Sequence, residues 1–95
     1  MAVKADLGVL IVANLKVVFF ASLRETMKCD ELELPVEGTL TVRQLKEKLA
    51  EQLQQPLLLE EKVKAAIDFD FARDEDLIEP DKVREVAFFP PVTGG

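Results

Sequence analysis

The sequence contains no histidine, tryptophan or tyrosine, and its single cysteine is Cys29. Without histidine, the chain lacks the side chain that most often shuttles protons or binds metals. One cysteine excludes an internal disulfide and any paired-cysteine metal motif. There is also no glycine-rich phosphate loop and no nucleophile elbow. We therefore expect no metal site and no permanently bound cofactor, and a chain that is not catalytic alone.

Positive charge is scarce as well, because 12 lysines and arginines stand against 18 aspartates and glutamates, a formal net charge of −6. Nucleic acids and anionic membrane surfaces both need a basic footprint, so we expect neither as a partner. The charge suits a partner with a basic docking face, or it only keeps the chain soluble. The lone thiol fits a reducing cytoplasm, and Asp30 and Glu31 beside Cys29 oppose thiolate formation.

Residues 1–15 include an apolar run at residues 7–13. This run is far shorter than the roughly 20 residues that span a bilayer. A signal peptide is the alternative, because Lys4 precedes the run, but Asp6 flanks it and no small-residue cleavage site is clear. We predict an N-terminal extension that pairs as an extra strand or packs on an exposed patch.

The rest of the chain predicts four strands and one main helix. Strands are expected at residues 16–21, 30–36, 61–69 and 86–89, with a polar turn at 24–28 and a short helical turn at 77–80. The second strand alternates and contains Pro35, which indicates a sheet edge. Thr41 and Gln44 form a capping box for a helix whose apolar stripe comprises Val42, Leu45, Leu49 and Leu53, and which Pro56 ends. The order predicts an α+β domain with the helix across one face of a mixed sheet.

One helix cannot cover both faces of this sheet, yet the first and last strands are apolar on both faces. In the first strand Val18 and Phe20 lie opposite Val17 and Phe19, and Phe88 and Phe89 likewise point opposite ways. One set should therefore stay exposed as a partner interface. The alternative is that the N-terminal apolar run or a second copy of the chain covers it.

Residues 88–95 read Phe-Phe-Pro-Pro-Val-Thr-Gly-Gly. Pro90 and Pro91 end the strand, because neither ring donates a backbone hydrogen bond. From Pro90 to Gly95 the chain could reach roughly 20 Å at about 3.3 Å per residue. Two terminal glycines make a thin end that fits a narrow slot, so the Gly95 carboxylate is a candidate reactive group. A frayed end without function is the alternative.

This end resembles the signature of the sulfur-carrying small subunit of molybdopterin synthase, the MoaD family. Residues 16–25, Lys-Val-Val-Phe-Phe-Ala-Ser-Leu-Arg-Glu, resemble the first strand of that family and the turn after it. The resemblance implies a ubiquitin-like β-grasp domain at residues 16–89, with its first and last strands parallel at the centre, and a reactive tail at 90–95. It does not cover residues 1–15. Asp68 stands where the family usually has asparagine, and residues 80–85 form a longer loop that lacks the family's glycine.

The resemblance also implies a mechanism and partners. An ATP-dependent adenylating enzyme would dock a face made of Phe20, Phe71 and Phe89 and convert the Gly95 carboxylate to an acyl-adenylate and then a thiocarboxylate. The large subunit of molybdopterin synthase would then take up the tail in a cytoplasmic heterotetramer, where the carrier gives its sulfur to cyclic pyranopterin monophosphate. The tail residues that the two partners would hold are Pro90, Pro91, Val92 and Thr93, and Gly94 belongs with Gly95 to the reacting end.

Three other functions stay open from the sequence. The sulfur carrier of thiamine biosynthesis shares the diglycine end and its chemistry, but normally lacks the Phe-Pro-Pro lead-in. A ubiquitin-like modifier would join Gly95 to a lysine of a partner. A β-grasp interaction module would carry the diglycine without using it.

Overall fold

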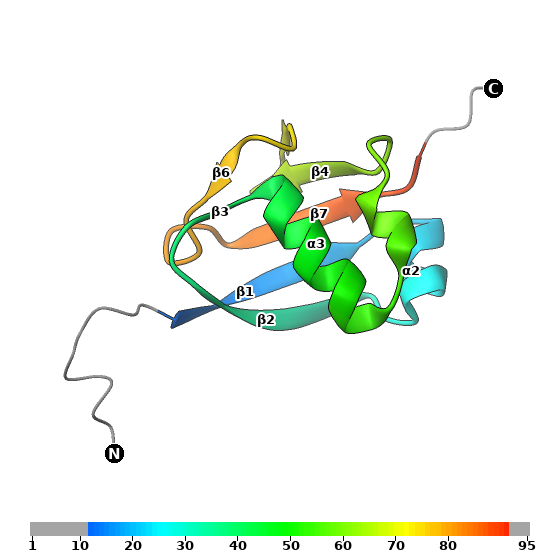
Figure 1. Ribbon diagram of the computed structural model, residues 1–95, viewed down its shortest axis with the longest axis horizontal. Coiled ribbons are helices and arrows are strands. Elements are labelled where there is room, and N and C mark those ends of the chain that lie inside the picture. The colour runs from blue at the N-terminus through cyan, green and yellow to red at the C-terminus, as the bar shows by residue number, and fades with distance from the viewer. Residues whose placement is uncertain (1–11, 92–95) are drawn as a thin grey trace, which may run out of the picture.

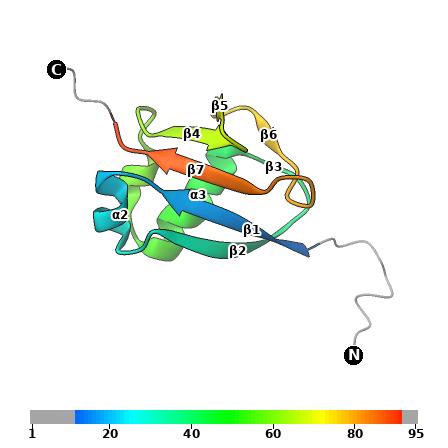
Figure 2. The same cartoon turned by 180° about the vertical axis from the view of Figure 1, so that it is seen from behind.

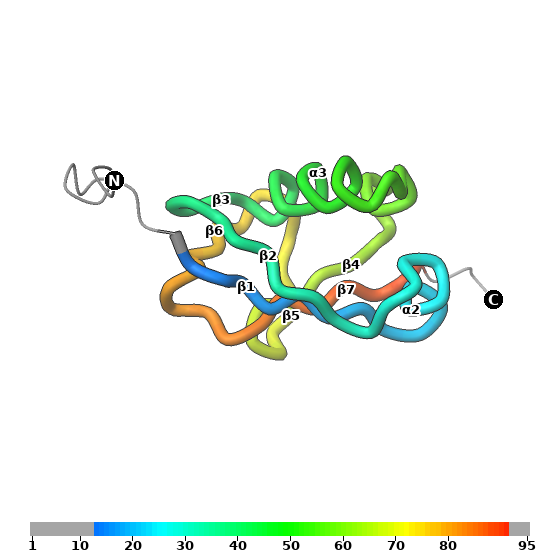
Figure 3. Tube along the Cα trace, turned by 90° about the horizontal axis from the view of Figure 1, so that it is seen from below, coloured from blue at the N-terminus to red at the C-terminus, as the bar shows by residue number. Residues whose placement is uncertain are grey.

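The computed structural model describes residues 12–91 as a mixed sheet with one helix across it (Figure 1). The sheet has the strand order β2-β1-β7-β4-β5, and the helix α3 lies over one of its faces, as the view along the sheet shows (Figure 3). The predicted α+β architecture is thus present. The strands of this sheet are β1 (Val12–Phe19), β2 (Glu31–Glu37), β4 (Lys64–Ile67), β5 (Asp70–Ala72) and β7 (Glu85–Phe89).

The two most apolar strands, β1 and β7, lie side by side at the centre of the sheet. They pair in parallel from Lys16 opposite Glu85 to Phe19 opposite Phe88. This confirms the parallel central pair that the family resemblance predicted. β2 pairs antiparallel with β1 at the edge of the sheet, where Pro35 costs no ladder hydrogen bond to a further strand.

The main helix, α3 (Val42–Leu53), begins as the sequence predicts. The Thr41 side chain accepts from the Gln44 backbone N–H at 3.1 Å, and the Gln44 side chain accepts from the Thr41 N–H at 2.9 Å. This confirms the capping box. The helix ends at Leu53 with Gln54 in a left-handed conformation, and Pro56 starts the short helix η1 (Pro56–Leu59).

The core lies between α3 and the sheet. Every second residue of β1 and of β7 points into it, including Val17, Phe19 and Phe88. The inward face of β2 adds Leu34 and Val36, and the apolar stripe of α3 closes the other side. The members of the stripe that are fully buried are Val42, Leu45 and Leu49.

The segment after β1 differs from the prediction. β1 starts at Val12, four residues before the predicted start at residue 16, so residues 12–15 belong to the sheet. The polar turn predicted at residues 24–28 is wrong, because α2 (Ser22–Met27) occupies it. Leu23 and Met27 are one helical turn apart and both are buried, which stabilises a helix that is too short to be stable alone.

The strand predicted at residues 61–69 is confirmed at residues 64–67 and is wrong at both ends. β4 ends at Ile67, and the chain reverses at Asp68 and Phe69, whose φ angles are 48° and 75°, before it returns as β5. Both angles are left-handed, as in the tight turns of hairpins. A phenylalanine in this conformation costs about 1 kcal/mol. Phe69, which the sequence predicted to be the last residue of the strand, is therefore in a turn and exposed.

Asp68 fixes this turn to the start of β7. Its Oδ1 accepts from the backbone N–H groups of Arg84 at 2.8 Å and Glu85 at 2.9 Å, and its own N–H donates to the Glu85 carbonyl at 3.0 Å. The family resemblance puts asparagine at this position. The carbonyl oxygen of asparagine could accept the same two bonds, so the aspartate keeps this part of the amide's role.

The short helical turn predicted at residues 77–80 is wrong, because Leu77 and Ile78 form β6. β6 (Leu77–Ile78) pairs antiparallel with β3 (Leu40–Thr41) in a separate small sheet. The pairing lets the apolar Ile78 enter the core, while Leu77 points to solvent. The loop after β5 also contacts the start of α3, since the Val42 and Arg43 N–H groups donate to the carbonyls of Asp76 and Asp74.

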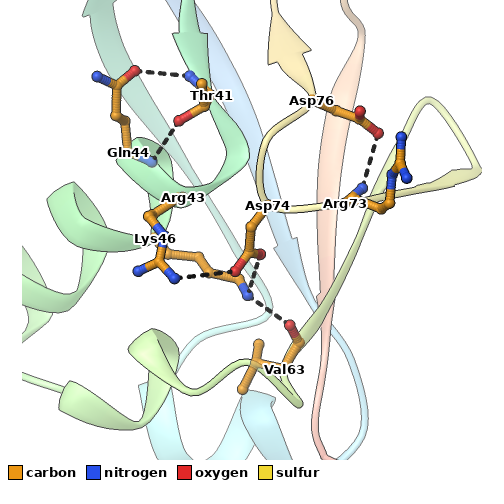
Figure 4. A network of polar contacts seen from close by, with 8 residues as sticks. All are labelled: Thr41, Arg43, Gln44, Lys46, Val63, Arg73, Asp74 and Asp76. Carbon is orange, nitrogen blue, oxygen red and sulfur yellow. Dashed lines mark hydrogen bonds and ion pairs between the residues drawn. The ribbon is translucent and has the colours of Figure 1, made fainter.

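A buried lysine of α3 also binds the loop that follows β5 (Figure 4). Lys46 is 2% exposed, and its Nζ donates to the Val63 carbonyl at 2.7 Å and to Asp74 Oδ1 at 2.8 Å. Arg43 lies 3.9 Å from the other carboxylate oxygen of Asp74. These contacts join α3, the segment before β4 and the loop after β5. No pattern in the sequence indicates these contacts, because most lysines on helices are exposed to solvent.

Candidate functional site

The face of the sheet opposite α3 is open in the described part of the chain (Figure 2). Burial alternates along β1, so that Val17 and Phe19 lie in the core, while Val18 is half-buried on the open face. Phe20 follows on that face and is 40% exposed. The alternation of side chains along the strands left open which apolar set is exposed, and the structure answers this question. Val18 and Phe20 belong to the open face.

Three phenylalanines from three parts of the chain meet on this face, and we call them the aromatic cluster: Phe20, Phe71 and Phe89. The rings of Phe20 and Phe89 stack with their centroids 4.9 Å apart and an interplanar angle of 5°. Phe71 lies 5.7 Å from Phe89 at a tilt of 53° and is 78% exposed. The structure therefore brings together the three residues that the resemblance assigned to a docking face.

Strand pairing accounts for the position of each ring. The Phe20 N–H donates to the Phe88 carbonyl at 3.0 Å, which holds Phe20 beside the end of β7. Ala66 on β4 is the partner of both Ala87 on β7 and Phe71 on β5. The two alanines are buried although they lie on the open face, so small side chains form its floor between the larger rings.

Charged residues border this apolar floor. Lys16 lies 3.6 Å from Glu31 and 3.9 Å from Glu85 across neighbouring strands. Glu33 is directly opposite Lys16 in the β1–β2 ladder. One cation therefore stands among three carboxylates on this side, which leaves the border acidic. Lys64, opposite Phe89 in the ladder, lies on the other side.

The tail starts next to the aromatic cluster. β7 ends at Phe89, and Pro90 and Pro91 follow as half-buried residues without strand pairing. Because β1 and β7 are parallel, the chain leaves the sheet at the end opposite to where β1 begins (Figure 1). The remaining candidate residues, Val92, Thr93, Gly94 and Gly95, lie outside the described residues, as do residues 1–11.

The described residues offer little chemistry of their own. Between residues 12 and 91, no group of acidic or cysteine side chains is arranged to hold a metal ion. Burial, and secondly the charge of Asp30, raises the pKa of the Cys29 thiol, so the thiol form is favoured. In the same part of the chain, no helix is long and apolar enough to cross a membrane.

Sequence reasoning missed one exposed aromatic residue beside this site. Phe69 is 79% exposed in the turn between β4 and β5, two residues before Phe71. The alternation of residues 61–69 runs through the turn without a break, and the turn lacks the Asn-Gly or Asp-Gly pair that marks such hairpins. The pairing partner of Asp68 at the start of β7 is distant in sequence, so no local signal could have located the turn.

Comparisons with known proteins give consistent matches in sequence. The family model described as the ThiS family matches residues 17–95. The molybdopterin synthase sulfur carrier subunit of Escherichia coli (strain K12) is 40% identical to this chain over 84 residues. That alignment covers 85% of this chain and 99% of the relative.

Solved structures match in fold at lower sequence identity. The crystal structure of the SAMP1 protein from Haloferax volcanii superposes with a TM-score of 0.71 at 21% identity, covering 87% of this chain and all of that one (100%). The putative molybdopterin converting factor subunit 1 from Pyrococcus furiosus gives a TM-score of 0.60 at 23% identity, over 84% of this chain and 99% of that one. These likenesses confirm the predicted ubiquitin-like β-grasp fold.

Proposed function

The chain belongs to the ThiS family, and on that premise we propose that it is the sulfur carrier subunit of molybdopterin synthase. The observation that carries the proposal is the aromatic cluster at the root of the tail. Phe20, Phe71 and Phe89 form an exposed apolar surface on a rigid sheet, and the Phe-Phe-Pro-Pro-Val-Thr-Gly-Gly end starts from its last strand. A partner that binds the cluster would receive the tail in a fixed direction.

The proposed chemistry takes place at the carboxylate of Gly95. In an adenylating partner, a carboxylate oxygen attacks the α-phosphorus of ATP, pyrophosphate leaves, and an acyl-adenylate forms. The terminal sulfur of a persulfide donor then attacks the acyl carbon and displaces AMP, which gives an acyl disulfide. A thiol of the partner attacks the donor's sulfur in this S–S bond, so that a disulfide forms on the partner side and the Gly95 thiocarboxylate is released. A carboxylate is a poor acyl donor, whereas its mixed anhydride with phosphate is a strong one. ATP thus serves the partner as a substrate, and the carrier supplies only the reacting end.

Sulfur delivery is proposed to occur in the large subunit of molybdopterin synthase. The relative's name describes a subunit of that enzyme, which supports an assembly with a larger catalytic chain. We propose a cytoplasmic heterotetramer in which the tail, residues 90–95, enters the large subunit and donates sulfur to cyclic pyranopterin monophosphate. The low chemical capacity of the described residues supports this division of labour, because the partners would supply the acid–base groups.

The test is the intact mass of the chain after incubation with the adenylating enzyme of the same organism, ATP and a sulfide source. We expect a mass increase that corresponds to one oxygen replaced by sulfur, located at Gly95 and dependent on ATP. An unchanged mass would contradict the proposal, provided that the same enzyme preparation is shown to be active on another carrier protein. Adducts on lysines of other proteins that survive reducing gels would instead indicate a ubiquitin-like modifier.

The substrate of the loaded carrier separates the remaining alternatives. Conversion of cyclic pyranopterin monophosphate to molybdopterin by the large subunit would support the proposed pathway. Transfer only to a thiazole precursor would indicate the thiamine pathway. If truncation of the tail, residues 90–95, changed none of these activities, the chain would be an interaction module that does not use its diglycine end.

A further inference from the structure

Phe69 is an exposed aromatic residue in a backbone conformation that disfavours it. Its φ angle is 75°, and 79% of its surface is exposed to solvent. Among the described residues it takes part in none of the close ring pairs, which involve Phe19, Phe20, Phe71, Phe88 and Phe89. Glycine or asparagine suits this second position of a tight hairpin turn better. The ring therefore contributes neither to core packing nor to the geometry of the turn.

The turn itself is held by other groups. The two hydrogen bonds from the Arg84 and Glu85 N–H groups to Asp68, and the bond from the Asp68 N–H to Glu85, fix it to β7. These bonds use the backbone and the carboxylate of Asp68 but no atom of the Phe69 side chain. A substitution of Phe69 should consequently leave the hairpin in place, which separates a binding role from a folding role.

The hairpin lies on the functional side of the molecule. In the view along the sheet, the turn between β4 and β5 is on the side opposite α3 (Figure 3). Phe71, two residues after Phe69, belongs to the aromatic cluster and is similarly exposed. The exposed apolar surface thus continues from the cluster along β5 to the turn. Aromatic side chains, phenylalanine included, are enriched in the cores of protein interfaces.

The charges around the ring indicate the kind of surface it meets. Asp70 follows Phe69 and is exposed, and Asp68 and Glu85 lie at the base of the turn beside Arg84, whereas Lys64 and Arg73 line a pocket next to Phe71. The acidic border formed by Glu31, Glu33 and Glu85 lies on the same open face. A matching surface would combine an apolar pocket with basic side chains at its edge.

We propose that Phe69 is an anchor for the large subunit of molybdopterin synthase, inserted into an apolar pocket with a basic edge while the aromatic cluster binds beside it. The inference rests on the proposed function, and it adds a contact at the hairpin that the tail and the cluster do not include. It also explains why a strained turn carries a phenylalanine. The strain is tolerated because the ring binds a partner.

The experiment compares the full-length chain with its Phe69→Gly variant in two measurements. Thermal unfolding should show a midpoint that is unchanged or raised by about 4 °C, because glycine relieves the left-handed strain. Calorimetric titration with the large subunit of the same organism should show binding weakened about tenfold or more. Greater stability combined with weaker binding is a result that a purely structural role of Phe69 would not give.

Three further variants complete the experiment, of which the first two are controls and the third tests the basic edge of the pocket. Phe69→Leu keeps an apolar side chain in the turn and should retain most of the affinity. Leu77→Ala removes an apolar side chain that is 64% exposed on β6, in the separate small sheet, and should leave the affinity unchanged. Asp70→Asn should reduce the association rate and its dependence on salt if the pocket has a basic edge.

The outcomes separate the inference from the proposed function. If the unmodified chain binds the large subunit and accepts sulfur at Gly95, but Phe69→Gly binds equally well, the inference is wrong and the proposed function stands. Equal weakening by Phe69→Gly and Leu77→Ala would also overturn it. If the unmodified chain neither binds the large subunit nor accepts sulfur, both are wrong.

Discussion

Lys46 shows how much a single side chain can do in a domain this small. It is buried with its charge, and its counter-charge, Asp74, comes from a loop 28 positions later in the chain. A buried ion pair is weak evidence for stability, since an apolar residue of similar size often replaces it without loss. Removal of one partner is different, because the other charge is then left uncompensated. The two members differ in this respect, because the Lys46 side chain is 2% exposed, whereas that of Asp74 is 25% exposed and also lies 3.9 Å from Arg43.

We expect the two ends of this pair to respond unequally to substitution. Asp74→Ala should lower the free energy of unfolding by about 3 kcal/mol, because the buried ammonium group loses its carboxylate. Lys46→Met should change it by about 1 kcal/mol or less, since methionine fills the space without a charge. Urea unfolding measures both. Glu75→Ala is the control, because its pair with Arg73 is exposed and should contribute about 0.5 kcal/mol or less. Equal losses from Asp74→Ala and Lys46→Met would contradict this account.

Cys29 should react slowly in the folded chain. Burial and the charge of Asp30 raise the pKa of its thiol above its ordinary value, so less thiolate is present at a given pH than in the unfolded chain. The neutral thiol is thus favoured by folding. Its contribution to stability is complete below the unfolded pKa and is lost as the pH rises through the folded pKa.

Alkylation by iodoacetamide checks this expectation. At about pH 8.5, near the unperturbed thiol pKa, the folded chain should react several-fold more slowly than the chain unfolded in urea. Asp30→Asn should increase the rate in the folded state, because it removes the neighbouring negative charge. Faster alkylation of the folded chain than of the unfolded one would show that Cys29 is an activated thiol.

At the scale of elements, β7 belongs to the core on one face and to the candidate site on the other. Phe88 is fully buried, and its ring centroid lies 6.3 Å from that of Phe19. Phe89 instead stacks on Phe20 on the open face. Phe88→Ala should lower the free energy of unfolding by about 3–5 kcal/mol, and Phe89→Ala by about 1 kcal/mol. Binding of the large subunit should show the reverse order.

Denaturation and calorimetric titration of the two variants test this division. Phe88→Leu, which keeps the core apolar, should fold and bind nearly as the unmodified chain does, and it replaces Phe88→Ala if that variant is too unstable to study. A Phe89→Ala variant that loses as much stability as Phe88→Ala, or binds with unchanged affinity, would contradict the assignment of the two faces.

The elements that the sequence predicted are those with a local signal. Thr41 and Gln44 define the start of α3 within one turn, and the apolar residues of β1 and β7 identify the central pair. α2 was missed because its residues are mostly polar, and only Leu23 and Met27 reveal its buried side. The hairpin of β4 and β5 was missed because the turn depends on the contact between Asp68 and the start of β7, which no local pattern contains.

At the scale of the whole molecule, the candidate site was likewise predicted only where the sequence carried a signal. The family resemblance supplied Phe20, Phe71 and Phe89 as a docking face, and the sheet brings them together from the residue after β1, from β5 and from β7. Phe69 could not be included, since its exposure results from the unpredicted turn. Under the proposed function, the docking face on the sheet is separate from the tail that starts beside it, so that stability and reactivity would reside in different parts of the chain.

This separation predicts the effect of removing Gly95. The buried core of the described residues spans residues 15–88, so a chain that ends at Gly94 should unfold at the same temperature within about 1 °C. It should still bind the adenylating enzyme through the aromatic cluster, but we expect no ATP-dependent gain of sulfur by mass spectrometry, because the carboxylate would end short of the reacting site. A chain extended by one alanine after Gly95 is the matched variant, and it should fail for the opposite reason, since its carboxylate lies one residue too far. Sulfur gained by either variant at the rate of the unmodified chain would show that the reactive group is not the Gly95 carboxylate.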